Sequence, residues 1–185
     1  PYSGSTDPYS AGNGSIMRLA PVPMFFVNDL EAVVRYSAHS SRTTHGAQEA
    51  VDACKLFGVM IALALRGEDK ETVLFEAIRE LNIADISPKI AAIGAGAYRA
   101  KPHDEIRGRG YVVDSLEAAL WVFLHTEDYK SAVLAAVNLG DDADTTGAVL
   151  GQLAGAYYGA DAIPAGWLEK LAMRDLIKNY ALRLY

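Results

Sequence analysis

The feature that most constrains this chain is the scarcity of alternating apolar and polar residues in a sequence of 185 residues that includes 30 alanines. A half-buried strand alternates with a period of two, whereas alanine has the lowest free-energy cost of any residue in a helix. Hydrophobic residues make up 51% of the chain and charged residues 22%, which is enough apolar surface to bury a core. The sequence therefore predicts an all-α fold, a bundle of about eight helices in a single domain over 1–185.

Capping residues, glycines and prolines bound the expected helices. These run over 28–39, 47–65, 72–81, 88–100, 114–124, 126–138, 144–159 and from 167 onward. Asn28, Asp114 and Thr126 are the predicted N-caps, because each is a short polar side chain that precedes an apolar helical pattern. The helix over 47–65 is apolar nearly all round from Leu56 to Leu65, so we expect it at the centre of the bundle.

Charge and cysteine content exclude several classes of protein. The chain has 17 basic and 23 acidic residues, and its formal charge of −6 argues against a nucleic acid or an anionic membrane as partner. The single cysteine, Cys54, excludes a disulfide framework and a cysteine-based zinc site, which fits a reducing cytoplasm. The longest apolar run, Leu56–Leu65, is shorter than the ~20 residues of a transmembrane helix, and no signal-peptide pattern is visible. We therefore expect a cytoplasmic protein.

The segment Gly140–Gly147 (GDDADTTG) concentrates oxygen-bearing side chains between two expected helices. Three carboxylates and two hydroxyls fall within six positions, and carboxylates so close together repel unless a cation or several N–H donors neutralise them. One interpretation is a helix cap with acidic neighbours. The other is a site for Mg²⁺, Mn²⁺ or Ca²⁺, the ions that hard oxygen ligands select, although the spacing excludes an EF-hand. The residues alone leave both interpretations open.

The helix after this segment carries glycine at every fourth position. These glycines are Gly147, Gly151, Gly155 and Gly159. An interior glycine costs a helix roughly 1 kcal/mol relative to alanine, so a row of them predicts the close approach of another helix. Gln152 and the short length argue against a membrane helix of the same pattern. The acidic segment should therefore be mounted on a tightly packed helix.

The segment 12–18 (GNGSIMR) has a composition that suits an anion-binding loop. Gly12, Asn13 and Gly14 permit positive φ and can expose consecutive N–H groups to phosphate oxygens, and Arg18 could pair with phosphate or with a carboxylate. An ordinary turn is the alternative, and neither a Walker loop nor a Rossmann fingerprint is present. His45, before the central helix, is either a structural hydrogen-bonder or a catalyst. The segment 108–111 is either a surface turn or a mobile loop whose Tyr111 offers an aromatic shelf, and Cys54 is an expected core residue.

These segments, in this order, resemble the ADP-ribosylglycohydrolase family. The matching pieces are 12–18 (GNGSIMR), 44–53 (THGAQEAVDA), 110–123 (GYVVDSLEAALWVF) and 140–159 (GDDADTTGAVLGQLAGAYYG). The resemblance implies a compact orthogonal helical bundle, a centre of two Mg²⁺ or Mn²⁺ ions, and hydrolysis of the bond between ADP-ribose and a modified protein side chain. Arginine is the first expected acceptor, and an ADP-ribosylated protein or ADP-ribose is the expected partner.

The resemblance also assigns roles residue by residue. Asp142, Asp144 and Thr145 match metal ligands. The residues that match the substrate-binding set are Asn13, Gly14, Ser15, Met17, His45 and Tyr111. Asp141 stands where the family often has glycine, and its role is open.

The family's N-terminal motifs, Gly-Asp-Ala-x-Gly and Thr-Asp-Asp-Thr/Ser, do not occur in the chain. We therefore expect this sequence to be the C-terminal portion of such an enzyme, without the N-terminal helices and with the catalytic acidic residue outside it. The alternative is an inactive relative that binds ADP-ribose or serves as a crystallin-like structural protein. Without the N-terminal helices, the apolar faces of 56–65 and 147–159 should be exposed, which predicts self-association or pairing with the N-terminal segment.

Overall fold

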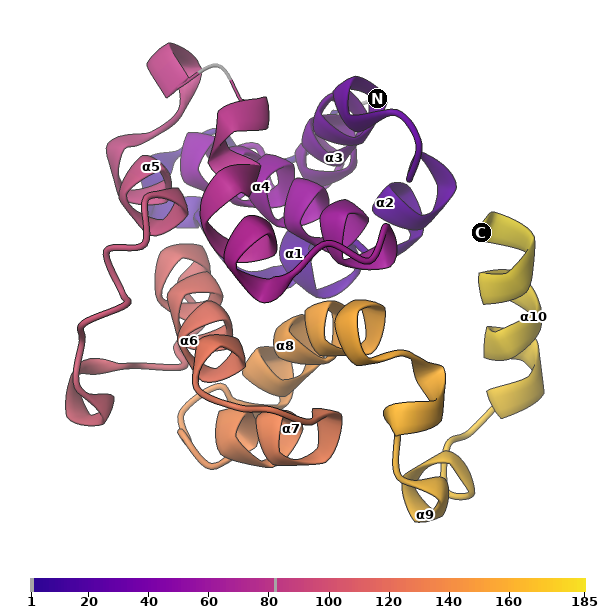
Figure 1. Cartoon of the computed structure of the whole chain (residues 1–185). Coiled ribbons are helices and arrows are strands. Elements are labelled where there is room, and N and C mark those ends of the chain that lie inside the picture. The colour runs from indigo at the N-terminus through magenta and orange to yellow at the C-terminus, as the bar shows by residue number, and fades with distance from the viewer. Residues whose placement is uncertain (1, 82) are drawn as a thin grey trace.

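The computed structural model describes residues 2–81 and 83–185, and over these residues the fold is helical (Figure 1). The α-helices are α1 (Gly14–Met17), α2 (Pro21–Phe25), α3 (Leu30–Arg42), α4 (Gln48–Leu65), α5 (Pro88–Gly94), α6 (Val112–Leu124), α7 (Tyr129–Val137), α8 (Ala143–Tyr158), α9 (Ala165–Leu168) and α10 (Arg174–Leu184). Single turns of 3₁₀-helix occur at Pro8–Ser10, Ala77–Glu80, Ile83–Asp85, His103–Glu105 and Ala160–Ala162, and Thr72–Glu76 is a short π-helix. The predicted all-α class is confirmed.

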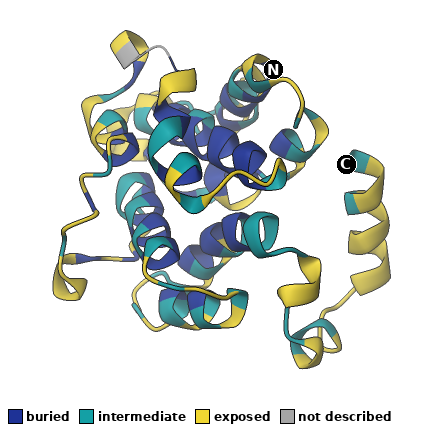
Figure 2. Cartoon of the chain, in the orientation of Figure 1, coloured by how far each residue is buried: buried dark blue, intermediate teal, exposed yellow. Residues whose placement is uncertain are grey.

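Helix α4 is the centre of the molecule. It packs against α3, α6 and α8, and its residues from Leu56 to Ala64 are all buried (Figure 2). The predicted central position is therefore confirmed. The expectation that the apolar faces of 56–65 and 147–159 are exposed is wrong. Helix α3 and the segments after α4 cover the first face within this chain, and α4, α6 and α7 cover the second.

The predicted N-caps are wrong by one to three residues, each for a structural reason. Asp29 rather than Asn28 caps α3, since its Oδ1 accepts from the backbone N–H of Ala32 at 2.9 Å. Helix α6 begins two residues before Asp114, because its first residue, Val112, is fully buried in the core. Contacts made far along the chain thus move helix ends that local capping residues would place elsewhere.

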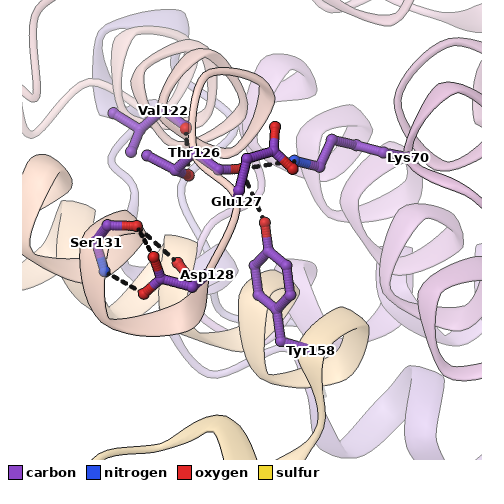
Figure 3. Close-up of polar contacts among 7 residues, drawn as sticks. All are labelled: Lys70, Val122, Thr126, Glu127, Asp128, Ser131 and Tyr158. Carbon is purple, nitrogen blue, oxygen red and sulfur yellow. Dashed lines mark hydrogen bonds and ion pairs between the residues drawn. The ribbon is translucent and has the colours of Figure 1, made fainter.

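Thr126 belongs to the end of α6 instead of the start of α7. Its hydroxyl donates to the carbonyl of Val122 at 2.8 Å, whereas Asp128 caps α7 by accepting from the N–H of Ser131 at 2.9 Å. Tyr158 and Lys70 both donate to the backbone carbonyl of Thr126, at 2.9 and 2.6 Å (Figure 3). The turn between α6 and α7 is therefore tied to the C-terminal end of α8.

Two expected helices are shorter or less regular than predicted. The stretch 72–81 forms a short π-helix followed by a 3₁₀ turn, and α5 ends at Gly94 instead of continuing to 100. Gly96 has a φ of +82°, and a Cβ there would lie 2.8 Å from the Phe75 ring. The chain therefore turns at Gly96 so that its backbone can pack against Phe75.

Three of the four glycines, Gly147, Gly151 and Gly155, face another helix as the sequence predicts, and that helix is α7. Gly159 instead ends α8 with a φ of +85° and has no atom near its Cβ position, and of the three only Gly147 is sterically required. A Cβ on Gly147 would lie 2.8 Å from Val137, which is closer than real Cβ contacts allow. At Gly151 and Gly155 the nearest atoms belong to Tyr129, at 3.5 and 3.8 Å, which is ordinary van der Waals distance. Of these three positions, Gly147 at the N-terminal end of α8 is therefore the most tightly packed against a side chain of α7.

The C-terminal segment lies apart from the bundle (Figures 1 and 2). Every residue of α10 is exposed except Ala181 and Leu184, which are partly exposed, and the helix contacts α2 across an apolar groove of about 480 Å³. Self-association stays a prediction. Seven of the thirteen large apolar side chains that are exposed among the described residues lie in this segment, from Leu171 to Tyr185, and none of the thirteen is on α4. Among the described residues, no helix combines the length and apolar character that a bilayer-spanning segment needs.

Candidate active site

Three segments that are distant in sequence meet at the N-terminal end of α8. The backbone N–H of Asn13 donates to the carbonyl of Gly110 at 3.1 Å, and the N–H of Val112 donates to the carbonyl of Ala11 at 3.0 Å. The N–H of Asp142 donates to the carbonyl of Gly108 at 2.8 Å. The loop over 108–110 therefore lies between the Asn13 segment and the acidic segment and is fixed to both.

The side chain of Asn13 makes the connection directly. Its Nδ2 donates to Oδ2 of Asp142 at 2.7 Å and to the carbonyl of Arg109 at 3.3 Å. Asn13 is 8% exposed, so these bonds form in a largely desolvated position where an unpaired amide would be costly. The structure thus brings together two predicted site residues, 129 positions apart in the chain.

The acidic segment does not cap α8 through the Asp142 side chain. Asp142 occupies the N-cap position, but its carboxylate makes no capping hydrogen bond; instead its backbone carbonyl accepts from the hydroxyl of Thr146 at 3.0 Å. Asp144 is exposed in the first turn, and Thr145 is 5% exposed. The simple helix-cap interpretation therefore fails for Asp142, whose carboxylate is oriented by Asn13.

Asp141 has a left-handed backbone conformation, with a φ of +52° beside Gly140 at +78°. Glycine adopts this region without strain, and aspartate is one of the few other residues that tolerate it. The Asp141 carboxylate lies 4.0 Å from Nε of Arg109, and both side chains are more than half exposed. The open role of Asp141 is thus first a conformational one: it holds the sharp turn into α8.

His45 lies against the glycines of the Asn13 segment. A Cβ on Gly14 would lie 3.0 Å from Cε1 and 3.1 Å from Nε2 of His45, and one on Gly12 would lie 3.5 Å from Nε2. Neither glycine has a positive φ, so the expectation that they provide such a conformation is wrong. Their small size lets the imidazole approach the backbone.

The main chain of His45 is held on both sides. Its N–H donates to the carbonyl of Ser41 at 2.7 Å, and its carbonyl accepts from the Ser41 hydroxyl at 2.8 Å. A Cβ on Gly4 would lie 2.5 Å from the His45 nitrogen, so the N-terminal strand-like segment packs tightly on it. Burial, and secondarily the Arg18 charge, lower the pKa of His45, which favours a neutral imidazole.

Tyr111 forms one wall of a cavity of about 400 Å³ beside this loop. Its hydroxyl donates to Oε2 of Glu49 at 2.5 Å and accepts from Nζ of Lys89 at 2.7 Å. Pro8 and Tyr9 line the same cavity. Burial and the Glu49 contact raise the pKa of Tyr111, so the phenol stays protonated and its ring is fixed in place.

Ser15 and Met17 occupy opposite environments on α1. Ser15 is completely buried, with its hydroxyl facing the Cys54 thiol, so only its backbone is available to the site. Met17 is 37% exposed. Cys54 is buried as predicted for a core residue, and burial raises the pKa of its thiol to about 11.

Sequence reasoning missed the positioning role of Gln152 on α8. Its Oε1 accepts from the N–H of Ala20 at 2.8 Å, and its Nε2 donates to the carbonyl of Ile16 at 2.9 Å. These bonds clamp the end of α1 and the start of α2 onto α8, and they complement the Asn13 bond to Asp142. A glutamine in the middle of an apolar helix is the only signal for this role in the sequence.

The candidate metal ligands offer oxygen atoms only. Two carboxylates and one hydroxyl suit Mg²⁺ or Mn²⁺ in chemistry, but not in number, since such ions take six or so ligands. Among the described residues, no three or more His, Cys, Asp or Glu side chains are grouped closely enough to hold a metal ion. These residues thus fit part of a coordination shell.

The arrangement joins the acidic N-terminal end of α8 to a glycine-containing loop within a helical fold. Residues 1–185 match the family model for ADP-ribosylglycohydrolase, and the chain belongs to this family. The predicted family resemblance is therefore confirmed.

Named relatives agree with this membership. The chain is 45% identical over 184 residues to "ADP-ribosylarginine hydrolase Tri1" of Pseudomonas putida (strain GB-1), covering 100% of this chain and 48% of the relative. It is 33% identical over 175 residues to the "ADP-ribosyl-[dinitrogen reductase] glycohydrolase" of Rhodospirillum rubrum, covering 92% of this chain and 57% of the relative. The chain thus spans about half the length of these curated relatives.

A solved structure shares the fold. It is titled "ADP-ribosylglycohydrolase-related protein complex", and it superposes with a TM-score of 0.89 at 42% identity, covering 100% of this chain and 62% of the other.

Proposed function

We propose that the complete protein hydrolyses the glycosidic bond between ADP-ribose and a modified protein side chain, with arginine as the first acceptor to test. The observation that carries the proposal is the 2.7 Å hydrogen bond from Asn13 to Asp142, which joins the two motifs most typical of the family. Similarity to relatives named for ADP-ribosylarginine and ADP-ribosyl-[dinitrogen reductase] hydrolysis supports it.

We assign the substrate to the space around the Asn13 segment. In this proposal, Asn13, Gly14 and Ser15 present backbone or amide groups to the diphosphate and ribose, and Met17 lies beside them. His45 offers a neutral imidazole to a substrate oxygen, and Tyr111 offers the face of a ring fixed by Glu49 and Lys89. These residues bind and orient the substrate.

Asp142, Asp144 and Thr145 are proposed as oxygen ligands of a centre of two Mg²⁺ or Mn²⁺ ions, whose other ligands come from outside these residues. When bound, such ions orient hydroxyl oxygens and lower the pKa of a bound water. In this chain, Asn13 holds the Asp142 carboxylate in place, and Gln152 fixes α1 against α8. The proton-transferring carboxylate is proposed to lie outside this chain, and a cytoplasmic location remains part of the proposal.

The experiment is hydrolysis by the complete protein. ADP-ribosylated arginine substrate is incubated with it in the presence of Mg²⁺ or Mn²⁺, and release of ADP-ribose is expected. A parallel titration with ADP-ribose by calorimetry measures binding alone. Binding without release from any acceptor would favour the alternative of a non-catalytic ADP-ribose-binding protein, and neither binding nor release would overturn the proposed function.

A further inference from the structure

Arg18 ends the GNGSIMR motif but takes no part in the contacts described so far. Its guanidinium donates to the carbonyl of Ser40 at 3.0 Å, and to the hydroxyls of Ser40 at 3.2 Å, Thr43 at 3.2 Å and Thr44 at 2.7 Å. Within the part of the chain that the structure describes, no carboxylate lies within ion-pair distance of Arg18. All these hydrogen bonds of the guanidinium therefore go to the end of α3 and the turn that follows it.

The shortest of these bonds leads to His45. The Thr44 Oγ1 that accepts from Arg18 also lies 2.8 Å from Nδ1 of His45. A guanidinium can only donate, and a threonine hydroxyl has a single proton. With Arg18 donating to the oxygen, the hydroxyl proton is free to be donated to Nδ1, and the described residues offer it no other acceptor.

Donation from the Thr44 hydroxyl to Nδ1 would select one tautomer of a neutral imidazole. If Nδ1 accepts from Thr44, the ring proton is on Nε2. Nε2 is the nitrogen that faces the loop of Gly12 and Gly14, because a Cβ on Gly14 would lie 3.1 Å from it. Among the described residues, Nε2 has no hydrogen-bond acceptor in the protein, so its N–H is available to a ligand.

We propose that Arg18 and Thr44 are positioning residues that hold His45 as the Nε2–H tautomer, so that it donates a hydrogen bond to an oxygen of the substrate bound at the Asn13 loop. Only the identity of that acceptor oxygen rests on the proposed function; the tautomer rests on the contacts of this chain. The clamped main chain of His45 supports the proposal, since ring rotation is the remaining freedom and Thr44 removes it.

The test is a spectroscopic one on the complete protein labelled with ¹⁵N-histidine. Long-range ¹⁵N–¹H correlation spectra at neutral pH distinguish the two tautomers, and the His45→Asn variant assigns the His45 signals. We expect wild type to show the Nε2–H form. Thr44→Val removes the hydroxyl at similar shape and should give a mixture of tautomers, whereas Thr44→Ser should restore the wild-type pattern.

A matched control is Thr43→Val, because the Thr43 hydroxyl also accepts from Arg18 but does not contact His45. It should leave the tautomer unchanged. In the hydrolysis assay, Thr44→Val should lower kcat/KM by about tenfold, the loss expected for one misdirected hydrogen bond, and Thr43→Val should not.

An Nδ1–H tautomer in wild type, or a tautomer that Thr44→Val does not change, would overturn the inference. Failure of the hydrolysis assay alone would count against the proposed function and not against this positioning role, since the spectra do not depend on turnover.

Discussion

The two ends of α8 differ in how the charged side chains beside them are compensated. At the C-terminal end, the Lys70 side chain is 17% exposed, and its ammonium donates to the Thr126 carbonyl and lies within 6 Å of the ring centres of Phe123, Tyr157 and Tyr158. At the N-terminal end, Asp144 is exposed beside other carboxylates, and Asp142 is held by one amide.

The difference indicates which end of α8 has charged groups that a ligand could still compensate. The Lys70 charge is matched by a carbonyl, by aromatic faces and by Glu127 at 3.6 Å, so nothing further is needed there. At the other end, the neutral Asn13 amide orients Asp142 without neutralising it, and Asp141 has the exposed Arg109 at 4.0 Å. The C-terminal end therefore stabilises the fold, and the N-terminal end is where a cation would be stabilised.

The largest expected effect is that of Asp144→Asn, which removes the charge while keeping the shape. In the complete protein it should abolish hydrolysis and the response to metal. Wild type should gain stability with millimolar Mn²⁺, since an ion at 100 times its Kd adds about 2.7 kcal/mol to the free energy of unfolding. The variant should gain none, and without metal it should be at least as stable as wild type because carboxylate repulsion falls.

The measurement is the melting temperature with and without Mn²⁺, next to the hydrolysis assay. Asp161→Asn, an exposed change beyond the other end of α8, is the control and should behave as wild type. An equal metal response in the Asp144→Asn variant would exclude Asp144 as a ligand.

Lys70→Met tests the opposite end. It keeps the aliphatic stem but removes the hydrogen bond to Thr126 and the cation–π contacts, so the free energy of unfolding should fall by about 1–3 kcal/mol. The gain in stability with Mn²⁺ should remain. Denaturant unfolding measures the loss, and Lys130→Met on the exposed side of α7 serves as control. If Lys70→Met leaves stability unchanged, the contacts of Lys70 with Thr126 and the aromatic rings do not stabilise the fold, and the contrast between the two ends of α8 is lost.

Two glycines of α8, one near each end of the helix, test how tightly the two ends are packed. Gly147→Ala should destabilise by about 1–2 kcal/mol, because its Cβ would overlap Val137. Gly155→Ala has room beside Tyr129 and should be neutral or stabilising by up to about 1 kcal/mol, the helix propensity of alanine over glycine. Urea unfolding of the two single variants distinguishes these outcomes; equal losses would mean that Gly155 is required as much as Gly147.

The helices were predictable because alanine content, apolar periodicity and glycine or proline boundaries are local properties. The pairings at the site were not. Nothing in the sequence indicates that Asn13 bonds to Asp142, or that the smallness of Gly14 serves His45, because both contacts depend on how distant segments pack. For the same reason the caps of α6 and α7 were displaced, and Gln152, which has no motif of its own, was overlooked as a clamp.

A smaller effect concerns pH. Burial and Arg18 lower the folded-state pKa of His45 below the value of ~6.5 of an unfolded chain. As the pH falls below that value, the unfolded state takes up the proton first, so the His45 contribution to stability is complete above about pH 6.5 and is lost as the pH falls through the folded pKa. His45→Gln should therefore flatten the decline of stability between neutral and mildly acidic pH. Unfolding free energies at several pH values measure it, and a steeper decline in the variant would contradict the assignment.

The smallest expected effect is at Asp141, where the turn into α8 is left-handed. Asp141→Gly should relieve the strain of a φ of +52° but adds backbone freedom to the unfolded state, so the net gain in stability should be at most about 1 kcal/mol. Asp141→Ala keeps the strain and lacks the tolerance of aspartate for a positive φ, so it should be less stable than wild type and than Asp141→Gly. If the Asp141 carboxylate were itself a metal ligand, both variants would lose the Mn²⁺ response alike. Comparing stability and Mn²⁺ response in this pair therefore separates the conformational role of Asp141 from the role of its charge. Only Asp141→Gly relieves the backbone strain, whereas both variants remove the carboxylate.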